Sequence, residues 1–484
     1  MTASSDTPRE IPSSIGGSSG PGGFRRVLTL RSLIGASVGV VLSQAGMVTL
    51  LQATGLGGYG VFTALAIAVV LSLTYVVSFA ELALMFPSAG SLSVYTKVAL
   101  GDFPALAATF SGYVIPAMFG LSAELLLIGN IGDRLVPGLL PPIAIAWLLL
   151  GVFAVLNILG IDLFARIQNA LTVVKVLAIL TIGLGAIALS AIQTSTPPVV
   201  ALPDQTNNIG FLGLVTLVMM TFLGVEMICP LVEETKAPEK DLPRAMIISV
   251  FVIGGLSAIF CLGAKLTMPA EQLSTSPAPH LDYVVRVFGR AATLILAAAI
   301  VTATCGVVNG VLATVPRILY GMACNGQAFG TFKRLHPRFR TPWVAILFMT
   351  LVAGLPLIVL HDRADMLTIL LISTSVPWLL AYIIAHVDVL ALRRRLPNKR
   401  RPFKTPFYPI PQIIGIAGMG CAVVYNAPTP ELSRAVYASV GVVILATCLA
   451  SALWVKFVMK RGLFEADAFD PATLSDPTNA LTGK

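Results

Sequence analysis

The sequence has little charge. Asp, Glu, Lys and Arg make up 11% of its 484 residues and 56% are hydrophobic, whereas an ordinary soluble chain is about one quarter charged. This composition excludes a soluble globular protein. The net charge of +9 does not indicate a nucleic-acid partner. With a cytoplasmic N-terminus, most Lys and Arg residues fall in segments on the cytoplasmic side, as the positive-inside rule predicts.

Cysteine and histidine are also scarce. The six cysteines lie in or beside apolar segments without CxxC spacing, which argues against a disulfide framework. The four histidines are scattered, and the sequence contains neither an HExxH nor a GxxxxGK[ST] motif. A metallohydrolase and an NTPase are therefore not indicated. We expect no enzyme activity, no metal and no cofactor.

Long apolar segments recur along nearly the whole chain. Each is about 17 to 25 residues long, enough for an α-helix to cross a hydrocarbon core of ~30 Å. Their residues do not alternate as those of barrel strands do. The sequence thus predicts an all-α polytopic membrane protein with twelve transmembrane helices. Their centres lie near Val40, Val70, Phe119, Leu150, Ile179, Met220, Val252, Ala299, Leu351, Leu380, Gly418 and Leu445.

Two of the predicted helices contain features that interrupt a helix. The first includes GASVGVVLSQAGMV (residues 35–48), with a polar Ser43–Gln44 pair between glycines, and the sixth includes FLGVE (222–226), followed by Pro230. Transporters often bind substrate at the bilayer midplane, where helices at corresponding positions of two repeats are broken. The alternative is an ordinary packing role, because membrane helices tolerate Gly and Pro.

Four phrases resemble signatures of the amino acid, polyamine and organocation (APC) transporter superfamily, amino acid permease type. They are AELALMFPSAGSLSVY (80–95), EETKAPEKDLPRAM (233–246), ATVPRILYGMACNGQAFGTFKRLHPRFRTP (313–342) and RRPFKTPFYPIPQIIG (400–415). The resemblance implies a LeuT-like fold, a five-plus-five inverted-repeat core with helices 1 and 6 interrupted, followed by two additional helices. It also implies secondary active transport by alternating access.

The composition of the N-terminal segment, rich in Gly, Ser and Pro, and the same resemblance divide the chain. Residues 1–24 are expected to be a disordered cytoplasmic tail, 25–395 the ten-helix transport core, 396–460 a cytoplasmic link with helices 11 and 12, and 461–484 a second cytoplasmic tail. We expect a bacterial inner (plasma) membrane protein with both termini cytoplasmic. Members that pair with a single-pass glycoprotein use a cysteine in the loop after helix 3, and residues 131–142 contain none. No disulfide-linked heavy subunit is expected.

Glu226 is a carboxylate in the middle of an apolar helix. Such a group costs about 2.5 to 3.5 kcal/mol on insertion scales, so it is a functional candidate. In the family, helix 6 unwinds here and its carbonyl groups hold the substrate's amino group. The resemblance thus implies a substrate site formed by Ser43, Gln44, Ala45, Gly46, Phe222, Gly224, Val225 and Glu226. Glu226 would pair with a cationic substrate or take up a proton, or it is a protonated acid bonded to a neighbouring helix.

Lys175 is the one basic residue placed inside a predicted span. It lies about 13 Å along the helix from Arg166, too far for its side chain to reach the interface. In proton-coupled members a lysine at this position stands where sodium-coupled relatives hold an ion. The resemblance implies that Lys175 braces helix 1 against helix 5 and couples transport to protons; a structural contact with a carbonyl is the alternative.

Three further residues are secondary candidates. Glu124 in helix 3 is a second acid deep in the membrane, and a structural hydrogen bond explains it equally well. Trp378 and Tyr382 could stack on a cation, although packing is the simpler interpretation.

The chain departs from the family in helix 1. Relatives usually have a G-x-G-like phrase whose amides bind the substrate carboxylate, whereas this chain has Ser43, Gln44 and Ala45 before Gly46. A substrate with an amine but no carboxylate is therefore also considered.

The sequence thus predicts a proton-coupled permease for amino acids or related organic amines. The alternative within transport is a polyamine or cationic amino acid exchanger. From a different class, a nutrient receptor or channel on the same fold remains open. Beyond substrate, protons and the lipid bilayer, the sequence indicates no partner, and it does not give the oligomeric state.

Overall fold

The computed structural model describes residues 24–466 except 136, 137, 139, 193–207, 277, 290–292, 361–363 and 427–429. The expected tails, 1–24 and 461–484, therefore lie largely outside the described residues. Within the described ranges there are helices and no strand, and Leu28 and Thr235 form an isolated parallel bridge. The predicted all-α class is confirmed.

The elements follow one another along the chain as α1 (Leu30–Val41), α2 (Gln44–Gly57), α3 (Gly60–Met85), α4 (Leu92–Leu100), α5 (Asp102–Thr109), η1 (Phe110–Val114), α6 (Ile115–Leu135), α7 (Pro142–Ile158), α8 (Ile161–Ile192), α9 (Asn208–Met219), η2 (Met220–Phe222), η3 (Val225–Glu234), α10 (Pro238–Thr267), α11 (Ala270–Thr275), α12 (Pro279–Phe288), α13 (Thr293–Cys324), η5 (Gly330–Lys333), α14 (Trp343–Leu360), α15 (Ala364–Arg395), α16 (Ile410–Val424), α17 (Pro430–Leu453) and η6 (Trp454–Met459).

The described helices have the lengths of a polytopic membrane protein. Eight are long and apolar enough to cross a bilayer, or nine if the bent pair α1 and α2 forms one span. Three more predicted spans correspond to shorter apolar helices, at Pro142–Ile158, Trp343–Ile358 and Ile410–Val424. Helices thus lie at every predicted position, while the number of twelve crossings and the inverted repeat stay predictions.

The first interrupted helix breaks at Leu42 and Ser43. The backbone leaves the helical region there, and α1 and α2 meet at an angle of 60°. The Ser43 side chain accepts a hydrogen bond from the Gly46 amide at 2.8 Å. A serine in extended conformation is a favoured N-cap, so the polar residue singled out in the sequence starts the second half of the span.

The second interrupted helix breaks at Leu223 and Gly224. After α9, the short 3₁₀ segment η2 ends at Phe222, Leu223 is extended, and Gly224 has a φ of 105°. A side chain strains that left-handed region, and glycine does not. The 3₁₀ segment η3 then begins at Val225, so both predicted interruptions are present.

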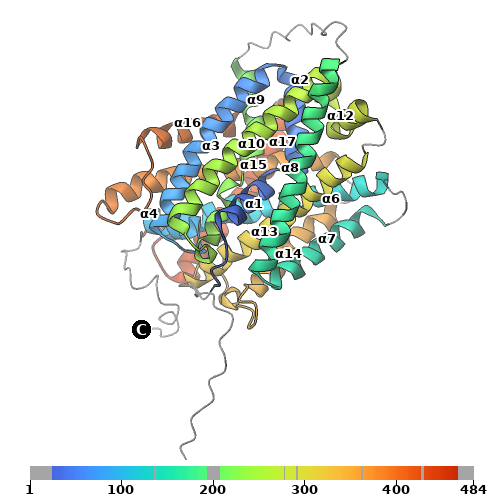
Figure 1. The fold of residues 1–484 in the computed structure, drawn as a ribbon. Helices are drawn as coiled ribbons and strands as arrows, with labels where there is room; N and C mark the ends of the chain where they lie inside the picture. The colour runs from blue at the N-terminus through green and yellow to red at the C-terminus, as the bar shows by residue number, and fades with distance from the viewer. Residues whose placement is uncertain are drawn as a thin grey trace, which may run out of the picture.

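The interrupted helices lie inside the bundle. α1 packs against α8, α10 and α13, and glycines permit the close approach. An added Cβ at Gly39 would stand 2.1 Å from Nε2 of Gln168 in α8. Figure 1 shows the long helices side by side, with α4 at the opposite end of the bundle from α2 and α12.

Candidate functional site

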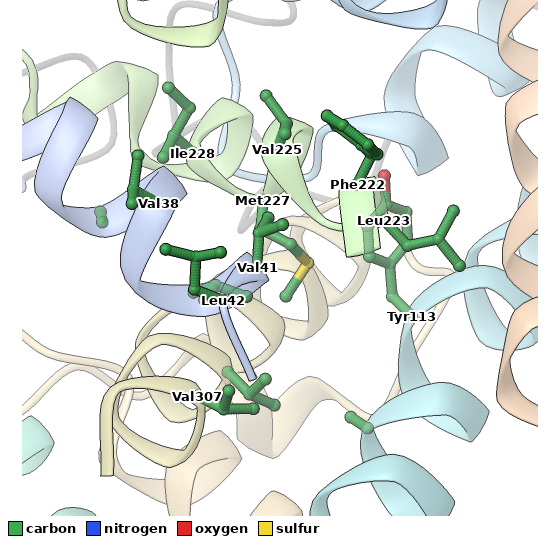
Figure 2. Close-up of a cluster of buried hydrophobic side chains, with 14 of the residues drawn as sticks. Val38, Val41, Leu42, Tyr113, Phe222, Leu223, Val225, Met227, Ile228 and Val307 are labelled. Carbon is green, nitrogen blue, oxygen red and sulfur yellow. The ribbon is translucent and has the colours of Figure 1, made fainter. Parts of the chain in front are cut away.

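A cavity of about 110 Å³ lies between the two breaks. Figure 2 shows apolar side chains of both breaks gathered here, Val41 and Leu42 from the first and Leu223 and Met227 from the second. Helices α6, α13 and α15 and segment η1 complete the wall. The lining residues are Val40, Val41, Ser43, Ala45, Gly46, Thr49, Tyr113, Pro116, Ala117, Gly120, Leu121, Glu124, Met220, Leu223, Met227, Val307, Val311, Thr374, Ser375 and Trp378.

The predicted residues of the first break divide into two groups. Ser43, Ala45 and Gly46 line the cavity. Gln44 does not, and its fully buried side chain is directed at His280 of α12 and Thr304 of α13, each at 3.5 Å. Gln44 therefore does not obstruct the amide groups at the start of α2.

Glu124 lies in the cavity wall, beside those amides. Its Oε1 accepts from the Ala45 amide at 2.9 Å, and its Oε2 accepts from the Thr304 hydroxyl at 3.1 Å. The N-terminus of a helix favours a negative charge through its free N–H groups and its dipole. The Glu124 carboxylate thus occupies the position at the start of α2 where the helix end favours an anion.

Glu226 lies behind the cavity wall. Its Oε1 accepts from the Trp378 indole N–H at 3.0 Å and its Oε2 from the Tyr382 hydroxyl at 2.5 Å. The Tyr382 hydroxyl in turn accepts from the Gly224 amide at 3.0 Å. Trp378 lines the cavity, whereas Glu226 and its predicted companions Phe222, Gly224 and Val225 do not. The buried acid is thus held by neutral donors from α15.

Tyr75 of α3 supports this group from a third helix. Its hydroxyl donates to the Phe222 carbonyl at 2.5 Å, and its ring stacks on that of Tyr382 with centroids 4.1 Å apart. One carbonyl and one amide freed by the second break are therefore satisfied by tyrosine hydroxyls, as buried backbone groups require.

Lys175 lies on the other side of helix 1. Its ammonium donates to the carbonyls of Gly39 at 2.8 Å and Leu42 at 2.7 Å, and the side chain is fully buried. These carbonyls belong to the last turn of α1, where a positive charge is favourable. One turn earlier on α8, Thr172 donates to the Gly35 carbonyl at 2.8 Å. The α8 face thus holds the free end of α1.

Several residues of the site had no signal in the sequence. Tyr113 of η1 and Thr304 of α13 are ordinary residues of apolar helices until the fold brings them to the cavity and to Glu124. Among the described residues, no cluster of three or more His, Cys, Asp or Glu side chains could hold a metal ion.

Comparison with known proteins identifies the family. The family model described as amino acid permease matches residues 28–450. This chain belongs to the amino acid permease family. It is a membrane transporter and not an enzyme, as the sequence predicted.

The permease is similar over most of its length to curated transporters. The serine/threonine exchanger SteT of Bacillus subtilis (strain 168) is 25% identical over 82% of this chain and 88% of its own. The branched-chain amino acid permease BcaP of the same organism is 26% identical, with coverages of 80% and 84%. Cationic amino acid transporter 4 of Homo sapiens is 26% identical over 76% of this chain and 60% of its own.

A solved structure shares the fold of the permease. A manganese transporter from Eremococcus coleocola superposes with a TM-score of 0.57, at 15% sequence identity, over 90% of this chain and 97% of that one. At this identity the likeness concerns the fold alone.

Proposed function

We propose that this permease moves a small neutral amino acid across a bacterial inner membrane by alternating access, with both termini cytoplasmic, coupled to protons through Lys175. The observation that supports this best is the position of the cavity. It lies between the breaks of the two interrupted helices, and transporters of this architecture bind substrate where such helices are broken. Ser43, Ala45 and Gly46 would face the substrate from the first break.

The size of the cavity favours a small substrate. Pockets for drug-sized ligands measure about 300 to 1,000 Å³, and a cavity of about 150 Å³ holds benzene. The cavity here measures about 110 Å³. An amino acid with a short side chain matches that volume better than a polyamine or arginine.

The surroundings of Glu226 favour a neutral substrate. A direct ion pair would need a carboxylate oxygen at the cavity surface, but Glu226 does not line the cavity, and Trp378 and Tyr382 each donate a hydrogen bond to one of its oxygens. In this role Glu226 holds those two side chains in place. Because cationic amino acid transporter 4 of Homo sapiens is a relative, a cationic amino acid exchanger is the competing hypothesis.

The coupling role rests on the carbonyls that Lys175 holds. A charged ammonium fastens the end of α1 to α8, and loss of its proton weakens both hydrogen bonds, because bonds from charged donors are the stronger ones. A proton gradient could thereby drive the movement of helix 1 in each cycle.

Transport in proteoliposomes tests this proposal. Uptake of L-alanine, L-threonine, L-arginine and putrescine is measured with and without a pH gradient, together with counterflow at equal pH. We expect saturable, gradient-stimulated uptake of the neutral amino acids. Lys175→Met should abolish the stimulation and retain counterflow, and Lys265→Met, at the far end of α10 over the Tyr59 ring, is the matched control.

The other outcomes decide among the alternatives. Transport of arginine or putrescine in preference to neutral amino acids would favour the cationic exchanger. Flux that does not saturate would indicate a channel, and binding without flux a receptor. If the pH gradient stimulated uptake by Lys175→Met as fully as uptake by the wild type, Lys175 would have no role in proton coupling.

A further inference from the structure

The Tyr113 hydroxyl is a buried polar group at the cavity. The side chain is 2% exposed, it lines the cavity, and the hydroxyl makes no hydrogen bond of ordinary geometry within the described residues. In Figure 2 the ring extends from η1 toward the second break, beside Leu223. Leaving such a hydroxyl unsatisfied costs about 1–3 kcal/mol, so the group indicates a ligand.

Four other polar side chains that line the cavity already have hydrogen-bond partners in the protein. The Ser43 hydroxyl accepts from Gly46, and Thr49 donates to the Gly46 carbonyl at 3.1 Å. Glu124 accepts from Ala45 and Thr304, and Trp378 donates to Glu226. Tyr113 therefore stands apart from them as an unsatisfied hydroxyl facing the cavity.

The fold fixes this hydroxyl in place. Tyr113 lies in η1, a π-helical segment that interrupts the third predicted span, and such segments are frequent at functional sites. The neighbouring Gly112 lets η1 pack closely on α15, since an added Cβ there would lie 2.4 Å from the Cβ of Ala381. This packing positions the backbone of η1, from which the buried ring of Tyr113 lines the cavity.

We infer that Tyr113 is a specificity-determining residue that binds a hydroxyl on the side chain of the substrate. The inference rests on the proposed function and adds a substrate class to it: small amino acids that carry a side-chain hydroxyl are preferred over aliphatic ones of the same shape. A substrate hydroxyl can both donate and accept, so it satisfies Tyr113 in either orientation of the phenol.

The position of Glu226 allows the Tyr113 hydroxyl to accept a hydrogen bond from the substrate. The Tyr113 hydroxyl interacts with the Glu226 carboxylate, although the geometry is not that of an ordinary hydrogen bond. When the phenol turns its proton toward that carboxylate, its lone pairs are free to accept from the substrate. The neighbouring Leu223 and Met227 leave an apolar surround, in which a neutral hydroxyl is less costly to bury than a charged group.

The test compares L-threonine with L-valine, which differ by a hydroxyl in place of a methyl group. For the wild-type permease in proteoliposomes we expect kcat/KM for threonine to exceed that for valine by about tenfold, the equivalent of one hydrogen bond. Tyr113→Phe should reduce this ratio to about one through a higher KM for threonine, with valine uptake retained.

Tyr95→Phe is the matched control. Tyr95 also has a buried hydroxyl without a hydrogen-bond partner among the described residues, and it does not line the cavity. This variant should keep the wild-type ratio. Where transport by a variant is too slow, the shift in Tm that threonine or valine produces on the purified protein gives the same comparison.

An unchanged threonine-to-valine ratio in Tyr113→Phe would overturn the inference and leave the proposed function standing. Equal use of threonine and valine by the wild type would do the same. Absence of saturable flux for any amino acid would instead overturn the proposed function, and this inference with it.

Discussion

At the scale of single residues, Glu226 shows how a buried acid is held without a cation. Trp378 and Tyr382 donate to its two oxygens. In Glu226→Gln one oxygen becomes an NH₂ group, so one of these donors loses its acceptor. We expect the free energy of unfolding in detergent to fall by about 1–3 kcal/mol and uptake of neutral amino acids to slow. Thermal unfolding and uptake assays measure both effects.

Glu271→Gln, on the exposed start of α11, is the control and should change neither quantity. A Glu226→Gln protein of wild-type stability that had lost only cationic substrates would show instead that the carboxylate pairs directly with substrate.

The sequence predicted which polar side chains are buried better than it predicted the direction in which they point. Counting residues from Arg166 was enough to place Lys175 inside the membrane, because helical rise is fixed. Whether Glu226 points into the cavity depends on α15, whose Trp378 is 152 residues away, and no local pattern encodes that packing. Gln44 was predicted to form part of the substrate site, but its side chain is directed at His280 and does not line the cavity.

At the scale of elements, α12 is held against the first break by a histidine. His280 is buried beside Gln44, and burial lowers the pKa of His280 to about 4 although the nearby Asp282 opposes the shift. The usual pKa of histidine is about 6.5. Above pH 6.5, the burial of neutral His280 therefore does not weaken the docking of α12. As pH falls through 6.5 toward 4, only the undocked state takes up the proton, and docking weakens.

Between pH 7 and pH 5 this linkage amounts to about 2 kcal/mol. We therefore expect hydrogen exchange of Pro279–Phe288 to accelerate at pH 5, after correction for the intrinsic pH dependence of exchange. His280→Gln, which has no titrating ring, should remove the additional acceleration. Equal protection of α12 at both pH values in the wild-type protein would contradict the prediction.

Packing of α1 against α13 depends on Gly306. An added Cβ would lie 2.9 Å from the Gly39 carbonyl and 3.1 Å from the Lys175 ammonium, so it would push helix 1 away at the carbonyl that Lys175 holds. Overpacking costs about 1–3 kcal/mol. We expect Gly306→Ala to lower Tm and gradient-driven uptake together.

Gly151→Ala is the matched control, because an added Cβ in this part of α7 meets nothing within 4 Å. There the higher helix propensity of alanine should leave Tm unchanged or raise it. A Gly306→Ala protein as stable and active as wild type would show that α1 is not held as closely as the structure indicates.

The interruptions were predictable elements, since glycine and polar residues were combined in both apolar segments. The π-helical segment η1 was not, because nothing in FSGYV distinguishes it from an ordinary apolar helix. Helices α11 and α12 were also missed. They lie in a polar connection between spans, where apolar length gives no signal.

At the scale of the whole molecule, segments far apart in sequence close one end of the bundle. Residues 24–28 lead into α1 and run beside the end of η3, where the amides of Val27 and Leu28 donate to the Glu234 carbonyl at 2.9 Å. Phe24 packs on Tyr320 of α13. Because η3 follows the second break and residues 24–28 precede the first, this closure ties both interrupted helices to α13.

Arg317 is the centre of that closure. It forms a bidentate pair with Glu234 at 2.6 and 3.0 Å, and both side chains are almost fully buried. Removing one member of a buried pair leaves the other charge uncompensated, at a cost of about 3–5 kcal/mol. We expect Arg317→Ala to lower Tm strongly and to slow transport, because it weakens the contacts that join both interrupted helices to α13.

The exposed ion pair between Arg400 and Glu239 is the control for the buried pair, because it joins the same two residue types at the surface. Surface pairs contribute about 0–1 kcal/mol, so Arg400→Ala should leave Tm and uptake nearly unchanged. Exchanging the charges, Arg317→Glu with Glu234→Arg, should restore part of the lost stability if the pair itself holds the end closed. Equal effects of the buried and the exposed substitutions would show that the closure depends on the apolar contacts of Phe24 and Leu28 alone.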